Sequence, residues 1–166
     1  MSSFSPNLNH DAGIRFPKDA CVVIVRTEWN AAIIDILESG CTTVLKQNGV
    51  SYKIIHVPGA FEIGFAIKQY WEKNKENPTE KPAAFIALGC VLRGDTPHFD
   101  FVCKAVTDNI AQLNITLPVP SIFGVLTVDN QQQADDRTTG KHGNKGAEAA
   151  VTALKMISFN LNLDKK

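Results

Sequence analysis

Strand-like apolar segments alternate with longer amphipathic segments along most of the chain. The clearest is 21–26, a continuous run of mostly β-branched residues, and comparable segments occupy 52–57, 83–92 and 119–128. Short apolar runs of this kind are typical of parallel strands that are buried on both faces. We therefore predict four strands, separated by segments that contain glycine, proline or polar residues.

Helical periodicity fills the stretches between these strands. Apolar residues recur three or four positions apart over four of the segments, and one further segment is short and polar. These patterns predict helices over 29–47, 61–73, 97–113, 131–137 and 147–160. Because strand and helix alternate throughout, the predicted fold is α/β, with a parallel sheet covered by helices on both faces.

The start of the chain has a different character. Residues 1–15 are polar and contain serine, asparagine, proline and glycine, which predicts a flexible arm outside the core. Residues 16–166 are predicted to form a single domain, because one domain typically holds roughly 150 residues. The arm can add an edge strand to the sheet of a neighbouring subunit, although Pro6 and Pro17 limit the pairing.

Charge and hydropathy exclude several classes of protein. The chain carries 17 Lys and Arg residues and 17 Asp and Glu residues, so its formal charge is zero. A protein that binds nucleic acid or a membrane surface would show a basic excess. No apolar run approaches the roughly 18 residues of a membrane helix, and no signal peptide is recognisable. We therefore expect a cytoplasmic protein that binds neither nucleic acid nor membrane.

The cysteines and histidines indicate neither a disulfide framework nor a metal site. No two cysteines are spaced as CxxC, and the four histidines share no ligand spacing. We expect reduced, mostly buried thiols at all four cysteine positions, which are Cys21, Cys41, Cys90 and Cys103.

The predicted fold indicates where a ligand should bind. In parallel α/β sheets, ligands bind beyond the carboxyl ends of the strands. The segments at those ends are 26–30, 57–62, 93–98 and 129–137.

The segment 93–98 has the features of an anion site. Thr96 is a favoured N-cap, Pro97 is a favoured first helical residue, and Gly94 lets the backbone approach a ligand. Free N–H groups and the helix dipole at such a start attract a phosphate. His98 in the first turn would stay neutral and able to accept a proton. The alternative is a capped helix start that binds nothing, with His98 as a surface residue.

Cations near the last predicted helix could assist at that site. Arg137 is expected at the end of the short polar helix, where its guanidinium can bind a phosphate through two hydrogen bonds. Lys141 and Lys145 fall in a predicted glycine-containing loop over 140–146 and could add charge. The alternative for Arg137 is an ion pair on a solvated helix face.

Aromatic residues follow the first two predicted strands. The rings of Trp29 and Phe61 could stack on a flat heterocycle, and Glu62 could accept hydrogen bonds from hydroxyl groups. The alternative is that both aromatic residues begin helices and pack into the core.

Taken together, these segments resemble the lumazine synthase family over about residues 20–160. The resemblance rests on RTEWN, VPGAFEI, GCVLRGDTPHFD, FGVLT, QADDR and GKHGNKGAE, which begin at residues 26, 57, 89, 123, 133 and 140. The combination of VPGAFEI, GDTPHFD and KHGNKG is highly specific. The resemblance implies a three-layer, flavodoxin-like sandwich with a four-stranded parallel sheet. Gly64 departs from the family, because many members have proline there.

The resemblance also implies a group of residues that binds a ribitylamino-pyrimidine. In this group the Trp29 ring would stack on the pyrimidine, and the Glu62 carboxylate would hold the ribityl chain. Backbone groups at the other positions would complete the contacts. The whole group is Trp29, Asn30, Ala60, Phe61, Glu62, Val91 and Leu92.

A second implied group handles phosphate and protons. The N–H groups of Asp95 and Thr96 would bind the phosphate of a four-carbon sugar phosphate, with Arg137 as its charged ligand. His98 would transfer protons, and two residues of a neighbouring subunit would complete the site. The catalytic residues implied are His98, Arg137 and Lys145, and the residues from the neighbour are Phe123 and Lys145.

The implied activity is that of a transferase in riboflavin biosynthesis that requires no metal or other cofactor. Family members form pentamers, some build a sixty-subunit icosahedral shell, and association with a riboflavin synthase is a further expectation. Two alternatives remain at this point. One is a flavin- or nucleotide-binding module, because doubly wound sheets often bind FMN at strand ends. The other is a shell protein without catalytic activity.

Overall fold

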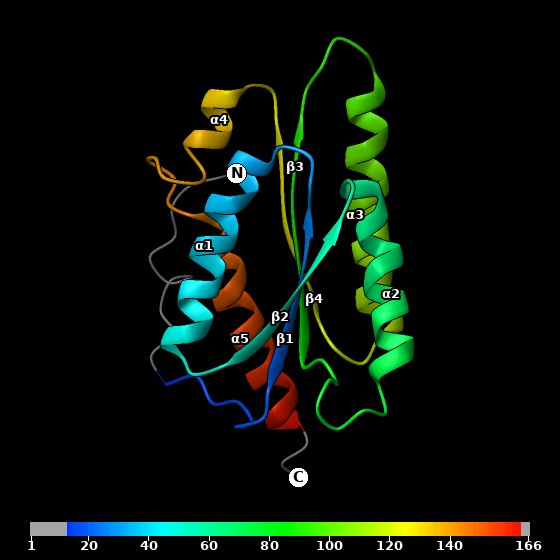
Figure 1. Cartoon of the computed structure of the whole chain (residues 1–166), viewed down its shortest axis with the longest axis vertical. Helices are drawn as coiled ribbons and strands as arrows, with labels where there is room; N and C mark the ends of the chain where they lie inside the picture. Colours follow the sequence, from blue (N-terminus) through cyan, green and yellow to red (C-terminus); the bar gives the residue numbers. More distant parts are fainter. Residues whose placement is uncertain (1–12, 164–166) are drawn as a thin grey trace.

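A four-stranded parallel sheet forms the centre of the computed structural model, which describes residues 13–163 (Figure 1). The strands lie in the order β2-β1-β3-β4, and all three pairings are parallel. Their bounds are β1 Cys21–Thr27, β2 Ser51–Val57, β3 Ala84–Leu92 and β4 Ser121–Val128. All four predicted strands are therefore confirmed, with small differences at their ends.

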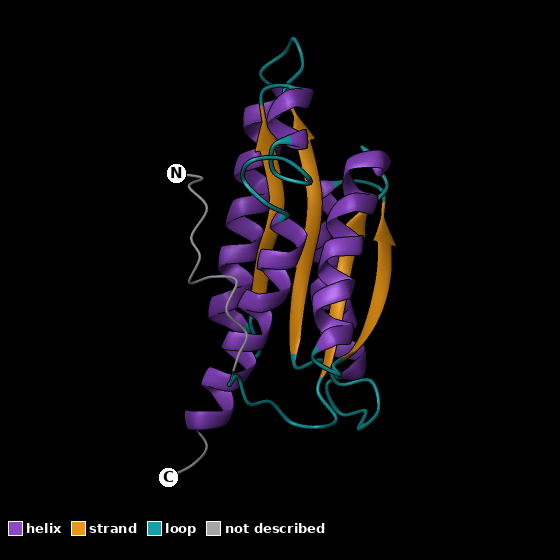
Figure 2. Cartoon of the chain, turned by 90° about the vertical axis from the view of Figure 1, so that its left-hand side faces the viewer, coloured by secondary structure: helices purple, strands orange, loops and turns teal. Residues whose placement is uncertain are grey.

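Helices cover both faces of this sheet, which confirms the predicted three-layer α/β fold (Figure 1). Figure 2 looks onto the face that α1 and α5 cover. α1 (Ala31–Gln47) and α5 (Lys145–Leu163) pack on one face. α2 (Ile63–Asn74) and α3 (His98–Thr116) pack on the other. A 3₁₀ turn, η2 (Ala60–Glu62), precedes α2, and a short α4 (Gln131–Asp135) follows β4.

Two hydrophobic clusters hold the layers together, one on each side of the sheet. Val22 and Ile24 of β1 belong to the cluster beneath α1 and α5, whereas Val23 and Val25 belong to the cluster beneath α2 and α3. All four of these side chains are fully buried. Since alternate residues of a strand point to opposite faces, a continuous apolar run is what a sheet covered on both sides requires.

The largest differences from the predicted elements lie after β4. The short helix ends at Asp135, so Arg137 lies two residues beyond it rather than at its end. The last helix begins at Lys145, so Lys145 is the first residue of a helix and not part of a loop. The side chain of Asn144 causes the earlier start, because its Oδ1 accepts a hydrogen bond from Ala147 N at 3.0 Å.

The N-terminal arm lies mostly outside the described residues. Of the proposed arm, only residues 13–15 belong to the described part, and Ile14 packs with Phe16 against the cluster beneath α1 and α5. The domain boundary and the pairing of the arm with a neighbour therefore remain predictions. Across residues 13–163, no helix combines the length and hydropathy needed to cross a membrane.

Close backbone contact between α1 and α5 fixes the start of α5. Asn144 Nδ2 donates to Ile36 O of α1 at 3.0 Å, across 108 residues of sequence. A side chain at Gly146 would collide with the backbone carbonyl of Leu37. On the other face of the sheet, a Cβ at Gly64 would lie 2.9 Å from Asn109 Cβ, so this glycine lets α2 approach α3.

We expect Gly146→Ala to destabilise the protein, although alanine is the better helix former by about 1 kcal/mol. The added methyl group would force α5 away from Leu37, and overpacking of this kind typically costs about 1–3 kcal/mol. Denaturant unfolding would measure the loss. Gly94→Ala is the matched control, because nothing lies within 4 Å of a Cβ at Gly94. Equal stability of the two variants would contradict the close packing of α1 and α5.

Candidate functional site

The carboxyl ends of β1, β2 and β3 surround a pocket of about 450 Å³, which we call the strand-end pocket. It lies where ligands bind in parallel α/β sheets. All seven residues predicted to bind the pyrimidine line it, together with His98. The full lining is Trp29, Asn30, Gly59, Ala60, Phe61, Glu62, Cys90, Val91, Leu92, His98 and Val102.

The turn between β1 and α1 holds the Trp29 side chain at this pocket. Asn30 adopts the left-handed conformation, with φ 60° and ψ 40°, and its Nδ2 donates to Cys90 O at 2.8 Å. Trp29 N donates to Pro58 O at 3.2 Å, and Thr27 Oγ1 donates to Trp29 O at 3.3 Å. These bonds join the ends of all three strands, so the geometry of the turn is set by the whole sheet edge.

The aromatic residues of the pocket are exposed rather than packed into the core. Trp29 is 73 % exposed and Phe61 is 59 % exposed. The alternative that both rings belong to the core is therefore wrong. Phe61 and Glu62 lie in η2, and His98 enters the pocket from the first position of α3. Exposed rings beside a carboxylate and an imidazole offer stacking, hydrogen bonding and proton transfer to a flat polar ligand.

The loop 93–97 connects β3 to α3 beside this pocket. Asp95 and Thr96 are exposed and do not line the strand-end pocket themselves. α3 begins at His98, one residue later than predicted, so Pro97 and not Thr96 is its N-cap, and no side chain caps the helix. Thr96 Oγ1 still accepts a hydrogen bond from His98 N at 3.4 Å. The loop therefore presents free backbone N–H groups next to His98.

Arg93, which the sequence analysis did not single out, organises that loop. Its Nε lies 2.8 Å from Asp129 Oδ1, and its Nη2 lies 3.3 Å from Asp100 Oδ1. The hydrogen bond from Arg93, followed by one from Gln133, lowers the pKa of Asp129 below its ordinary value. The signal available in the sequence was an isolated cation, at the end of a buried strand, close to two aspartates.

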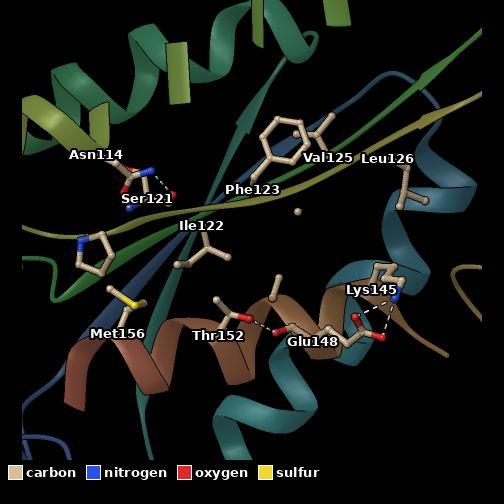
Figure 3. Close-up of a pocket in the computed structure, with 13 residues that line it drawn as sticks. Asn114, Ser121, Ile122, Phe123, Val125, Leu126, Lys145, Glu148, Thr152 and Met156 are labelled. Atoms are coloured by element: carbon tan, nitrogen blue, oxygen red, sulfur yellow. Dashed lines mark hydrogen bonds and ion pairs between the residues drawn. The ribbon is translucent and has the colours of Figure 1, made fainter. Parts of the chain in front are cut away.

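Phe123 and Lys145 lie in a different hollow, which we call the edge pocket (Figure 3). This pocket measures about 550 Å³ and lies between edge strand β4 and helix α5. Lys145 Nζ lies 2.8 Å from both carboxylate oxygens of Glu148, a partner that i,i+3 spacing in a helix could have indicated. The strand-end pocket does not include Phe123 or Lys145.

Arg137 also lies away from the strand-end pocket within one chain. It is half-buried in the turn after α4, and its Nη1 donates to Gln133 O at 2.8 Å. The structure thus brings together the predicted pyrimidine group and His98. It does not bring Phe123, Arg137 or Lys145 to the same pocket.

Sequence reasoning missed three lining residues of the strand-end pocket, namely Gly59, Cys90 and Val102. Val102 lies one helical turn after His98, a spacing that places both on one face of α3. Cys90 is a free thiol at the end of β3, and burial raises its pKa to about 11. Burial raises the pKa of Cys41 to about 12, so neither thiol is an activated nucleophile near neutral pH.

No grouping suited to a metal ion was found in the described part of the chain, residues 13–163. There, no three His, Cys, Asp or Glu side chains are arranged as metal ligands would be. The polar groups at the strand-end pocket suit an organic ligand with hydroxyl groups and a flat ring.

Comparison with known proteins adds independent information. A family model described as 6,7-dimethyl-8-ribityllumazine synthase matches residues 19–160. The protein of that name from Porphyromonas gingivalis is 49 % identical over 145 residues, which cover 86 % of each chain. That from Parabacteroides distasonis is 48 % identical over 140 residues, covering 82 % of this chain and 84 % of the relative. That from Cytophaga hutchinsonii is 44 % identical over 163 residues, covering 95 % of this chain and 98 % of the relative.

We expect Asn30→Ala and Asn30→Gly to separate two contributions to the free energy of unfolding, the hydrogen bond to Cys90 O and the left-handed backbone at Asn30. Both variants lose the hydrogen bond to Cys90 O, but only alanine also strains a backbone with φ 60°. Asn30→Gly should lose about 1 kcal/mol of unfolding free energy. Asn30→Ala should lose roughly 1–3 kcal/mol more. Unfolding curves would measure both, and equal losses would show that the left-handed conformation carries no cost.

Proposed function

Since the chain belongs to the 6,7-dimethyl-8-ribityllumazine synthase family, we propose that it condenses 5-amino-6-(D-ribitylamino)uracil with 3,4-dihydroxy-2-butanone 4-phosphate. The products are 6,7-dimethyl-8-ribityllumazine, phosphate and water, at the penultimate step of riboflavin biosynthesis. This makes the chain a transferase. The observation that carries the proposal is the strand-end pocket, where all seven residues expected to bind the pyrimidine lie together.

The proposed pyrimidine site follows from the chemistry of the pocket lining. The exposed Trp29 ring offers an apolar face on which the pyrimidine stacks. Glu62 accepts hydrogen bonds from ribityl hydroxyl groups, while the backbone near Asn30, Ala60 and Phe61 supplies further polar contacts. At the end of β3, backbone groups of Val91 and Leu92 pair with the pyrimidine edge. The left-handed turn at Asn30 supports this arrangement because it fixes Trp29 before the substrate arrives.

The sugar phosphate is proposed to bind at the adjoining loop. The free N–H groups of Asp95 and Thr96 and the start of α3 attract the phosphate, and Arg137 supplies a charged ligand. The Asp95 carboxylate must point away from the phosphate or be offset by Arg137. His98 then transfers protons between the reacting groups. The pyrimidine amine attacks the ketone and loses water to form an imine, and elimination of phosphate leaves an enol that becomes a second ketone. The second amine closes the ring on that ketone with loss of a second water.

Activity should appear when both substrates are supplied without metal or nucleotide, and absorbance of the lumazine product would measure it. His98→Ala should lower turnover by up to about 100-fold, with little effect on substrate binding. The folded protein making no product from both substrates would refute the proposed reaction. Purification with stoichiometric, redox-active flavin would instead support a flavin-binding module. If His98→Ala turned over as fast as the wild type at every pH, His98 would have no role in the mechanism.

Arg137→Ala should mainly weaken capture of the sugar phosphate. Loss of one charge-assisted hydrogen-bonded contact corresponds to about a 10- to 100-fold rise in its KM. The KM for the pyrimidine should stay within about 2-fold, since a stacked neutral ring makes little use of that charge. Lys68→Ala is the matched control, because Lys68 is an exposed cation of α2 that pairs with Glu72 and belongs to neither proposed group of site residues. An equal rise in both KM values would show that Arg137 is structural.

We propose that assembly completes the site. Phe123 and Lys145 lie away from the strand-end pocket of their own chain, so a second copy is needed to bring such groups to it. A cyclic pentamer is the smallest assembly proposed, and a sixty-subunit shell is the larger one. The segment from Arg137 to Asn144 is short, and we propose that it leaves contacts between pentamers unobstructed. We also propose that the N-terminal arm pairs with a neighbouring subunit and that the assembly associates with a riboflavin synthase. The proposed location is the cytoplasm.

Light scattering with electron microscopy should show pentamers or a closed shell, and no stable species at the 18.1 kDa of one chain. Dilution that releases monomers should abolish activity. Pentamers alone, at high protein concentration in both phosphate and low-salt buffer, would rule out the shell. A fully active monomer would overturn the shared site.

A further inference from the structure

Arg93 connects the loop 93–97 to β4 and to α3. Its backbone N–H donates to Val128 O at 2.9 Å, which extends the pairing of β3 with β4. Its guanidinium contacts Asp129 after β4 and Asp100 in the first turn of α3. The same group stacks over the ring of Phe99, with Cζ 4.0 Å from the ring centroid. One side chain thus determines where the loop lies relative to β4 and α3.

The contacts of Arg93 continue towards Arg137. Asp129, which accepts from Arg93, also accepts a hydrogen bond from Gln133 Nε2 at 3.4 Å, and Asp129 N donates to Gln133 Oε1 at 2.9 Å. Gln133 O in turn accepts from Arg137 Nη1 at 2.8 Å. The loop beside His98 and the proposed phosphate ligand Arg137 are therefore linked through two intermediate residues.

The charges around the loop explain why a cation is needed there. Between residues 93 and 100, Arg93 is the only lysine or arginine, while Asp95 and Asp100 are acidic. Asp129 adds a third carboxylate. Exposed ion pairs contribute little to stability, and the side chains of Arg93, Asp100 and Asp129 are all more than 40 % exposed. Unpaired carboxylates near an anion, however, repel it.

We propose that Arg93 is a positioning residue that makes the loop 93–97 competent to bind phosphate. It neutralises Asp100 and Asp129 and holds the loop against β4 and α3, and it does not contact the phosphate. Its Nε and Nη2 already face carboxylate oxygens, and it does not line the strand-end pocket. The inference rests on the proposed function, because that function assigns a phosphate to Asp95 and Thr96.

The test compares four forms of the full-length assembled protein. They are the wild type, Arg93→Gln, the triple variant Arg93→Gln with Asp100→Asn and Asp129→Asn, and the control Lys104→Gln. Lys104 suits the control because it is an exposed cation of α3 whose partner, Asp108, lies away from the loop. Calorimetry with inorganic phosphate measures anion binding without turnover, and steady-state kinetics give the KM for each substrate.

Arg93→Gln should raise the dissociation constant of inorganic phosphate and the KM for the sugar phosphate by about 5- to 20-fold. Its KM for the pyrimidine should stay within about 2-fold of the wild type, because no charge of that substrate faces the loop. The triple variant should return phosphate binding to within about 3-fold of the wild type, since it removes the charges that Arg93 neutralises. High salt should reduce the difference between Arg93→Gln and the wild type in the dissociation constant of inorganic phosphate, because salt screens the repulsion from the carboxylates. Lys104→Gln should match the wild type throughout.

Four results would overturn the inference. Phosphate binding that stays weak in the triple variant would mean that neutralising Asp100 and Asp129 is not what Arg93 contributes to anion binding. An equal rise in both KM values would mean that Arg93 only maintains the fold. Unchanged binding in Arg93→Gln, or no phosphate binding by the wild type, would remove the role altogether. Phosphate binding that follows the expected pattern in a protein that makes no product would refute the proposed reaction and leave the inference standing.

Discussion

The pairing of β1 with both β2 and β3 is the constraint on which the rest of the structure depends. β1 is the strand from which both neighbours take their register, with Thr27 opposite Val57 and Arg26 opposite Leu88. Because all three strands run in the same direction, their carboxyl ends meet at one edge of the sheet. The turn at Trp29, the turn η2 and the end of β3 consequently share one pocket. The bond from Asn30 to Cys90 O then ties the first of these segments to the last.

That arrangement leaves the pocket open on one side. Trp29 and Phe61 line it and remain largely exposed, and Phe123 is exposed on the edge strand β4. Large exposed aromatic residues are unfavourable in isolation and are typical of surfaces that another molecule covers. In this fold the sheet edge at β4 and the strand-end pocket are separate surfaces of one chain. The β4 edge of one copy can therefore lie against the strand-end pocket of a second copy. The proposed dependence of activity on assembly follows from that separation.

Two of the cations discussed above, Lys145 and Arg93, form ion pairs within the chain. Lys145 pairs with Glu148, and Arg93 pairs with Asp100 and Asp129. Groups held in place before a substrate arrives need little reorganisation during the reaction. The formal neutrality of the whole chain therefore conceals local pairing, in which Asp100 and Asp129 beside the loop both pair with Arg93. Net charge, from which we expect no binding to nucleic acid or membrane surfaces, could not reveal this pairing.

Local sequence determined the elements and the general place of the site. The apolar run 21–26 requires a strand buried on both faces, and the alternation with helical periodicity requires a parallel sheet whose ends bind ligands. Those rules were enough to bring Trp29, Phe61 and His98 to one pocket. Only the tertiary structure decided the left-handed turn at Asn30, the helical position of Lys145 and the network of Arg93. Each of these involves a partner far away in the sequence, namely Cys90 for Asn30, Ile36 for Asn144 and Asp129 for Arg93, beside any local contact. A local pattern contains no information about such a distant partner.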